Sequence, residues 1–174
     1  MDQLTSYPSP VGKLTLAARD GALIGLWIEG QKYFGNGLSG ERRENSSEPV
    51  LDAAKDWLSR YFAGEKPSPD ELPLCPMGSS FRQGVWELLR QIPYGELATY
   101  GSLARQMAEK MHRPGLAGQA IGGAVGHNPI SIIIPCHRVV GSDGSLTGYA
   151  GGLEAKVKLL QNEGVDLSRL RLPH

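Results

Sequence analysis

A proline-rich stretch in the middle of the chain restricts the folds that it can adopt. Residues 65–80, "EKPSPDELPLCPMGSS", contain four prolines, and proline neither continues a helix nor donates a hydrogen bond within a sheet. We therefore expect a domain boundary here, with an N-terminal domain over residues 1–73, a second domain over 77–165 and a tail over 166–174. Cys75 lies at this boundary, and we expect it to be an inert linker thiol.

The part before the prolines predicts a small α/β domain. Residues 11–30 alternate apolar and polar side chains around Asp20 and Gly21, a turn signal typical of a β-hairpin. Residues 48–64, "EPVLDAAKDWLSRYFAG", place apolar side chains on one helical face and end at Gly64, which suits a helix C-terminus. The pattern thus indicates strands followed by a helix.

The part after the prolines predicts mostly helices. Residues 79–95 form an amphipathic pattern behind a serine N-cap. Residues 151–164 form another, in which Leu153, Val157 and Leu160 are expected to face inward. The chain is therefore expected to be α+β, with a mostly helical C-terminal domain.

Two short helices are predicted between these patterns, over residues 98–111 and 116–129, with a Gly/Pro connection. This pair fits a helix-turn-helix, and a helical hairpin that packs on itself is the simpler alternative. The second helix is rich in glycine, and each glycine costs about 1 kcal/mol of helix propensity relative to alanine. Tight packing on another helix would explain the glycines, and so would close approach to the DNA minor groove, only about 6 Å wide.

A thiol and an imidazole follow an apolar run in residues 130–141, "ISIIIPCHRVVG". Residues 132–134 predict a buried strand that ends at Pro135. Cys136 then lies partly buried, where a cysteine is usually only a small hydrophobic residue. His137 beside it favours a nucleophile, because an imidazole can take up the thiol proton. Adjacent strand residues point to opposite faces, so the pair requires a turn at the proline or a bridging water.

Histidine needs a third group to fix its tautomer, and Glu163 is our candidate. It falls in the last turn of the predicted helix over 151–164, where the macrodipole disfavours an acid by about 0.3–1 kcal/mol. A partner such as His137 would explain its place there. An exposed surface glutamate is the alternative.

Charge and composition argue against several classes of protein. The 174 residues have no net charge, but residues 1–76 carry 8 basic and 11 acidic side chains, and residues 77–174 carry 10 and 7, a weak indication that the second half meets an anion. No apolar run reaches the roughly 20 residues of a membrane span, and the histidines show no metal-ligand spacing. The polar N-terminus and two cysteines favour reduced thiols in the cytoplasm.

The residues around the thiol resemble a known family. "PCHRVVG" (135–141), followed by "GSLTGYAGGLEAKVKLLQNEG" (144–164), closely resembles the signature of the O6-alkylguanine-DNA alkyltransferases, also called methylated-DNA–protein-cysteine methyltransferases. "SPVGKLTLA" (9–17) and "FRQGVWELLRQIPYGELATYGSLA" (81–104) extend the resemblance to residues 4–165.

The resemblance implies direct DNA repair by a methylated-DNA–protein-cysteine S-methyltransferase with a winged-helix-like helix-turn-helix. One alkyl group would move irreversibly from O6-alkylguanine in double-stranded DNA to Cys136 after base flipping, so each molecule would act once. We expect a monomer without cofactor, metal or membrane partner. The alternatives are an alkyltransferase-like lesion sensor, a class that lacks the acceptor cysteine, and a Cys-His hydrolase.

The resemblance also implies roles for single residues. Cys136 would be the alkyl acceptor, His137 its base through a bound water, and Glu163 the acid that orients the imidazole. Asn128 would brace the turn that precedes the active site. Tyr100 would help to rotate the target nucleotide out of the duplex.

Other matched positions concern the substrate. Tyr149, Ala150 and Gly151 would form the loop that closes over the flipped base, and the carbonyl of Val139 would accept from the guanine exocyclic amine. Gln119 stands where the family usually has an intercalating arginine and is our candidate for the wedge residue. The connection between the two short helices looks several residues longer than in the family.

Overall fold

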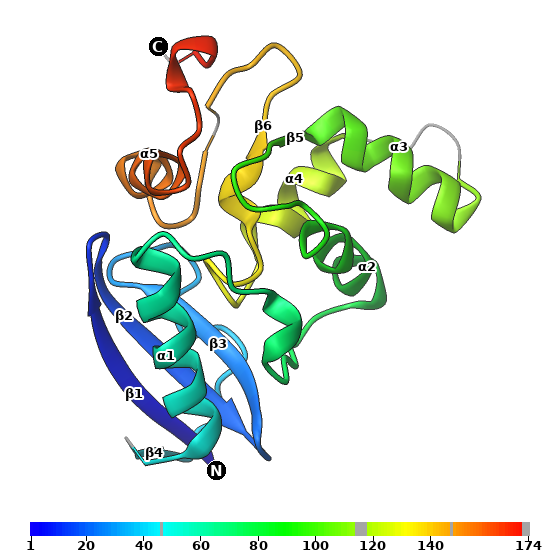
Figure 1. Ribbon diagram of the computed structural model, residues 1–174. Coiled ribbons are helices and arrows are strands. Elements are labelled where there is room, and N and C mark those ends of the chain that lie inside the picture. Colours follow the sequence, from blue (N-terminus) through cyan, green and yellow to red (C-terminus); the bar gives the residue numbers. More distant parts are fainter. Residues whose placement is uncertain (46, 114–117, 147, 172–174) are drawn as a thin grey trace.

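The computed structural model describes residues 1–171 apart from Ser46, residues 114–117 and Thr147. A sheet covered by one helix forms the N-terminal half, and a group of helices forms the C-terminal half (Figure 1). The sheet has the order β3-β2-β1-β4 and consists of β1 (Asp2–Ser9), β2 (Gly12–Arg19), β3 (Ala22–Ile28) and β4 (Arg42–Glu44).

Tight hairpins build most of this sheet. β1 pairs antiparallel with β2, β2 pairs antiparallel with β3, and β4 joins β1 in parallel. Asp20 and Gly21 have positive φ angles of 51° and 78°, as a two-residue hairpin turn requires. The hairpin predicted around these two residues is confirmed.

The helix α1 (Pro49–Phe62) lies across one face of the sheet (Figure 1). Its first turn is capped by Glu48, whose carboxylate accepts from the N–H groups of Val50 and Leu51 at 2.8 and 3.2 Å. The buried face comprises Val50, Leu51, Ala54, Trp57, Leu58 and Tyr61. The periodicity of the sequence predicts this face correctly.

The C-terminal half is mostly helical, which confirms the predicted α+β class. Its α-helices are α2 (Ser80–Leu89), α3 (Tyr100–Met111), α4 (Gly118–Gly126) and α5 (Leu153–Asn162). The strands β5 (Ala98–Thr99) and β6 (Val139–Val140) pair in parallel. Short 3-10 helices are η1 (Pro69–Glu71), η2 (Cys136–Arg138) and η3 (Leu167–Arg169).

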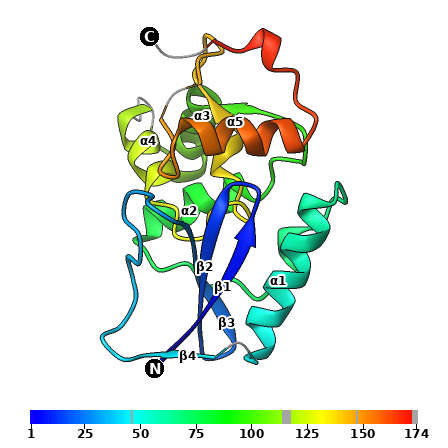
Figure 2. The ribbon, with the colours of Figure 1, turned by 90° about the vertical axis from the view of Figure 1, so that its left-hand side faces the viewer.

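The two halves share one apolar core, to which the main sheet and helices α1 to α5 all contribute. Backbone hydrogen bonds at the outer edge of β3 join the two halves. Leu26 donates to the carbonyl of Pro129 at 2.8 Å and accepts from Ser131 N–H at 3.0 Å. In the second view, α5 lies across the top of the sheet, so both halves meet beneath it (Figure 2). The segment before the thiol is therefore anchored on the N-terminal sheet.

The strand predicted over residues 132–134 is wrong. Ile130 forms a single bridge to Leu26, and the chain then turns, with Ile132 at a positive φ of 72°. The isoleucines are buried as expected. Their apolar run reflects the shared core and not a ladder, because burial alone does not distinguish a strand from a buried turn.

The inward face of α5 also differs from the prediction. Leu160 is buried, but Leu153 and Val157 are only partly buried, in a smaller apolar cluster. The buried face instead includes Ala155 and Lys156. The helix packs against two apolar clusters at once. Its buried face is therefore turned around the helix axis from the face that periodicity alone indicates.

Helices α3 and α4 contact each other. Residues 114–117 of their connection lie outside the described residues, so the helix-turn-helix and its longer connection stay predictions.

Candidate functional site

Cys136 and His137 lie in the 3-10 helix η2, directly after Pro135. Both are buried, with exposed fractions of 4% and 0%. The chain therefore turns at the proline. The sequence predicts that the thiol and the imidazole can interact only through such a turn or through a bridging water. Nδ1 of His137 has no hydrogen-bond partner among the described residues. A buried ring nitrogen without a partner is available to a water or a reacting group.

The opposite ring nitrogen of His137 meets Glu163. Nε2 lies 2.6 Å from Oε2 of the carboxylate, which is only 6% exposed, so Glu163 is not an exposed surface glutamate. Burial lowers the pKa of His137 more than the carboxylate raises it. The neutral ring then donates through Nε2–H and keeps its lone pair on Nδ1.

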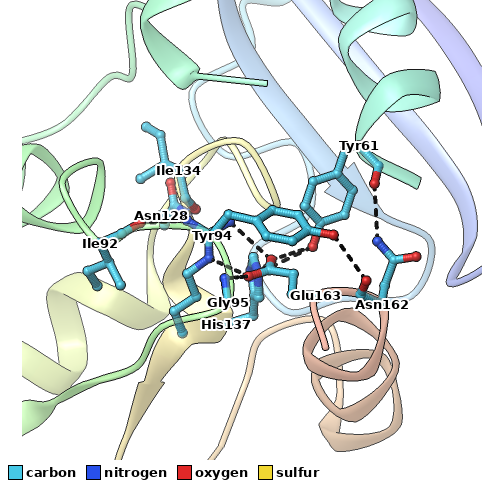
Figure 3. A network of polar contacts seen from close by, with 10 residues as sticks. Tyr61, Ile92, Tyr94, Gly95, Asn128, Ile134, His137, Asn162 and Glu163 are labelled. Atoms are coloured by element: carbon cyan, nitrogen blue, oxygen red, sulfur yellow. Dashed lines mark hydrogen bonds and ion pairs between the residues drawn. The ribbon is translucent and has the colours of Figure 1, made fainter. Parts of the chain in front are cut away.

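Several donors hold the carboxylate of Glu163 in place (Figure 3). Arg138 donates to both oxygens, from Nε at 2.8 Å and from Nη2 at 3.1 Å, and Gly95 N–H donates at 2.9 Å. The hydroxyl of Tyr61 donates to Oε2 at 2.5 Å. Burial alone would raise the pKa of Glu163, but the hydrogen bonds from His137 and Arg138 lower it to about 2. The acid is therefore ionised at neutral pH.

The side-chain amide of Asn128 connects the turn to the thiol. Its Nδ2 donates to the carbonyl of Ile134 at 2.8 Å and to Sγ of Cys136 at 3.2 Å, and its Oδ1 accepts from Ile130 N–H at 3.0 Å. Burial raises the pKa of the Cys136 thiol, and the Asn128 hydrogen bond only partly offsets this. The resting thiol therefore keeps its proton, and a base is needed to remove it.

Lys156 is a buried residue of this site that the sequence analysis missed. It is 0% exposed, and its Nζ donates to the carbonyl of Val139 at 2.6 Å. Burial lowers its pKa to about 8, while Cys136 acts in the opposite direction. Lys156 shares one helical face with Leu160 and Glu163, at positions i, i+4 and i+7, and this spacing could have identified it.

Two of the three residues predicted to close over a base, Tyr149 and Ala150, line a small hollow. The hollow has a volume of about 190 Å³ and is lined by Lys32, Tyr33, Gly126, Gly148, Tyr149 and Ala150. The carbonyl of Ala150 accepts from Lys32 N–H at 3.0 Å. At Gly151, a Cβ atom would come within 2.7 Å of Ile28 and 2.8 Å of the Tyr149 ring, so a side chain there would displace these neighbours.

The hydroxyl of Tyr149 is buried next to the Cys136 thiol and the Ser131 hydroxyl, without a well-formed hydrogen bond to a described residue. Burial, followed by the nearby Cys136, raises the pKa of Tyr149 well above its usual value. The hydroxyl therefore stays protonated. An unused donor beside the thiol is available to a substrate atom.

The remaining predicted contacts lie on α3 and α4 rather than in the network around Glu163. Tyr100 begins α3, after Thr99, whose hydroxyl caps the helix by accepting from Ser102 N–H at 3.0 Å. Gln119 lies exposed in the first turn of α4.

The glycines of α4 face open space. A Cβ atom built at Gly118, Gly122, Gly123 or Gly126 would meet nothing within 4 Å among the described residues. The buried side of the helix is formed by Ile121, Ala124 and Val125. Tight packing on another helix therefore does not explain these glycines, and close approach by an outside partner remains.

Two further sequence expectations concern Cys75 and bound metal. Cys75 is exposed, and its N–H donates to the carbonyl of Leu23 at 2.8 Å, so the linker runs along β3. Within the described part of the chain, no group of three or more potential ligand side chains could hold a metal ion. In the same residues, no helix is both long and apolar enough to cross a bilayer.

Known proteins resemble this chain over nearly its whole length. The family described as 6-O-methylguanine DNA methyltransferase matches with its ribonuclease-like domain at residues 4–76 and its DNA binding domain at 80–165. The methylated-DNA–protein-cysteine methyltransferase of Haemophilus influenzae is 44% identical over 161 residues, which cover 92% of this chain and 86% of the relative. That of Mycobacterium tuberculosis is 45% identical over 157 residues, 89% of this chain and 88% of the relative.

A solved structure shows the same fold. The crystal structure of Mycobacterium tuberculosis OGT in complex with DNA superimposes with a TM-score of 0.82 at 40% sequence identity. The match covers 97% of this chain and 94% of that one. The fold and the residues around the buried thiol are consistent with these similarities. The chain belongs to the 6-O-methylguanine DNA methyltransferase family.

Proposed function

We propose that this protein repairs O6-alkylguanine in double-stranded DNA by moving the alkyl group to Cys136. The observation that carries the proposal is the arrangement around the thiol. Asn128 donates to Sγ, and the neighbouring His137 has an unpartnered Nδ1 and a carboxylate on its other nitrogen. This arrangement suits a nucleophile that is activated by a base and oriented by an acid.

The chemical step exchanges one bond for another. Sγ of Cys136 attacks the alkyl carbon, the S–C bond forms, and the bond from that carbon to guanine O6 breaks. His137 takes up the thiol proton through a bridging water, and one proton is returned to the departing guanine. The thioether is a poor leaving group, so each molecule acts once and needs no cofactor.

The surroundings of the thiol favour its charged form at the moment of attack. Transient protonation makes His137 a cation, which the ionised Glu163 stabilises. The Asn128 amide and the Lys156 charge both lower the pKa of Cys136 against the effect of burial. The resting protein is thus uncharged at sulfur and is prepared for deprotonation.

The substrate base is placed in the hollow beside Tyr149, with the loop of Ala150 and Gly151 over it. The carbonyl of Val139 already accepts from Lys156, but a carbonyl has two lone pairs and can accept from the guanine amine as well. The protonated hydroxyl of Tyr149 lies next to the thiol and can donate to a substrate atom.

DNA contacts the exposed face of α4, with α3 and α4 acting as a helix-turn-helix of winged-helix type. Open space at the four glycines supports this assignment, because a helix whose outer face is mostly glycine can approach the narrow minor groove. Gln119 takes the place of the extruded nucleotide, and Tyr100 helps to rotate that nucleotide. The relative of known structure was crystallised in complex with DNA.

We place the domain boundary between residues 73 and 77, and the protein in the cytoplasm as a monomer. The match of separate family descriptions to residues 4–76 and 80–165 supports the boundary.

The proposal is tested by mass spectrometry after incubation with a duplex that contains O6-methylguanine. We expect the peptide with Cys136 to gain the mass of one methyl group, with one equivalent transferred per protein molecule. Repaired DNA beside unmodified Cys136 would contradict the proposal. Lesion binding without transfer would indicate a sensor, and several products per molecule from an ester or amide would indicate a hydrolase.

A further inference from the structure

We propose that Tyr61, a residue of the N-terminal half, is a positioning residue for alkyl transfer, because its hydroxyl holds the oxygen of Glu163 that His137 uses. This inference rests on the proposed function. It gives the N-terminal half a part in the chemistry beyond packing and stability.

Tyr61 reaches the site from the last turn of α1. Its hydroxyl lies 2.5 Å from Oε2 of Glu163 and 3.5 Å from Nε2 of His137 (Figure 3). The contact joins residues 102 positions apart in the sequence, and Tyr61 is completely buried. The N-terminal half thus donates directly to the catalytic acid.

The packing of Tyr61 fixes the direction of its hydroxyl. Its ring stacks on Trp57, with centroids 5.5 Å apart and an interplanar angle of 9°. Its backbone carbonyl accepts from Nδ2 of Asn162 at 3.2 Å, which joins the C-terminal ends of α1 and α5. A side chain held at both its ring and its backbone can present the hydroxyl to one acceptor only.

The hydroxyl acts as a permanent donor. Burial and the negative charge of Glu163 both raise the pKa of Tyr61, so the phenol does not ionise in the working pH range. Oε2 accepts from Tyr61, from His137 at 2.6 Å and from Nη2 of Arg138 at 3.1 Å. Each donor withdraws negative charge that would otherwise act on the imidazole.

Removal of the hydroxyl therefore leaves more carboxylate charge on His137 and stabilises its protonated form. Only the neutral ring accepts a proton from Cys136, so the acid side of the pH–rate profile should move to higher pH. The ionisable groups that face His137 and Glu163 are Tyr61, Tyr94, Cys136, Arg138, Tyr149 and Lys156. Of these, only Tyr61 comes from the N-terminal half.

Tyr61→Phe tests the proposal, with Tyr94→Phe as the matched control. The Tyr94 ring lies 5.8 Å from the Tyr61 ring, but its hydroxyl donates to the backbone carbonyl of Asn162 at 3.0 Å. Single-turnover transfer is measured in the full chain from about pH 5 to pH 9, a range that spans histidine titration. The amplitude counts folded, competent molecules, and the rate constant reports the chemistry, so a loss of stability is not mistaken for slower transfer.

We expect Tyr61→Phe to slow transfer by up to about threefold at the acid end of the range and by less near pH 8, with the acid limb moved upward by about half a pH unit. Tyr94→Phe should keep the wild-type profile. An unchanged acid limb in Tyr61→Phe, or an equal shift in Tyr94→Phe, would overturn the proposal. Absence of transfer in the wild type would instead overturn the proposed function.

A second variant keeps the test decisive if Tyr61→Phe does not fold. 3-Fluorotyrosine at position 61 preserves the ring and the hydroxyl but makes a more acidic, stronger donor. The acid limb should then move to lower pH. A shift in the opposite direction, or none, would contradict the role given to Tyr61.

Discussion

The network around Glu163 and the outer face of α4 differ in how far the protein completes its own contacts. Glu163 accepts hydrogen bonds from Tyr61, Gly95, His137 and Arg138, all within 3.1 Å. The glycines of α4 would meet no other described residue within 4 Å even with a Cβ atom added. One region is finished before any substrate arrives, and the other presents an unoccupied surface.

The network around Glu163 is suited to the chemical step, and the outer face of α4 is suited to binding. Buried charges that are held by fixed donors need no rearrangement during the reaction, which favours fast chemistry once the base is in place. A helix whose exposed face is mostly glycine loses part of its own stability and leaves room for another molecule to come close. Substitutions in the first region should therefore change the chemical step, and substitutions in the second should change binding alone.

Cys136→Ser should have the largest effect and abolish transfer. A hydroxyl is far less acidic than a thiol and makes a poor nucleophile, while the face of α4 that we propose to bind DNA is untouched. Methyl transfer is followed by mass spectrometry, and lesion binding by titration with a labelled duplex. Cys75→Ser is the matched control and should react at the wild-type rate, since that thiol is exposed on the linker. Residual stoichiometric transfer by Cys136→Ser would place the acceptor elsewhere.

Glu163→Gln should slow transfer by about 100-fold, because an amide cannot stabilise the His137 cation as a carboxylate does. The pKa of Cys136 should rise for the same reason. Single-turnover kinetics and thiol titration check the two effects together. An unchanged rate and an unchanged thiol pKa would remove Glu163 from the site.

The same substitution should also lower the free energy of unfolding by about 3 kcal/mol at pH 7, because Arg138 loses its buried charge partner. In the folded protein the pKa of Glu163 is about 2, below its ordinary value of 4.5. Its contribution to stability is therefore complete above about pH 4.5 and is lost as the pH falls toward 2. Denaturant unfolding at several pH values should show a weaker dependence in Glu163→Gln than in the wild type, because Asp2, whose pKa is also lowered to about 2, remains.

Gly123→Ala changes the outer face of α4 and leaves the network around Glu163 intact. Alanine fits the open space and should stabilise the free protein by up to about 1 kcal/mol, because it is the better helix former. The added methyl group should weaken duplex binding by about tenfold, since one lost contact of 1.4 kcal/mol changes affinity by that factor. Thermal unfolding and DNA titration measure the two effects.

Gly40→Ala is the control for this variant, because a Cβ atom there also meets nothing, and Gly40 lies in the loop before β4. It should leave duplex binding unchanged. Equal affinity of Gly123→Ala and the wild type would show that the outer face of α4 is not the DNA interface.

Gln119→Arg should have the smallest effect. The guanidinium adds a positive charge near the phosphates, so duplex binding should tighten and its log–log salt dependence should steepen by up to about one unit. The transfer rate at saturating DNA should barely change, because Gln119 lies on α4 and outside the network around Glu163. Salt titrations on one lesion-bearing duplex measure the slopes, and identical slopes would place residue 119 outside the interface.

Local patterns predicted much of the framework. The hairpin turn at Asp20 and Gly21, the helix over residues 48–64 and the adjacent thiol and imidazole depend on neighbouring residues, whose conformational preferences are written in short stretches of sequence. The run of isoleucines predicts a strand where the chain forms a turn, because an apolar run indicates burial and does not distinguish a strand from a compact turn.

Only the tertiary structure decided which groups meet at the carboxylate of Glu163. The sequence offered His137 as a partner, but nothing local indicated Tyr61, which lies 102 positions away. The sequence also left open whether the glycines of α4 pack against the protein. The structure shows that they face open space and contact no other described element. Such contacts depend on how separate elements pack in three dimensions, and the free energy of that packing is shared among residues far apart in the chain.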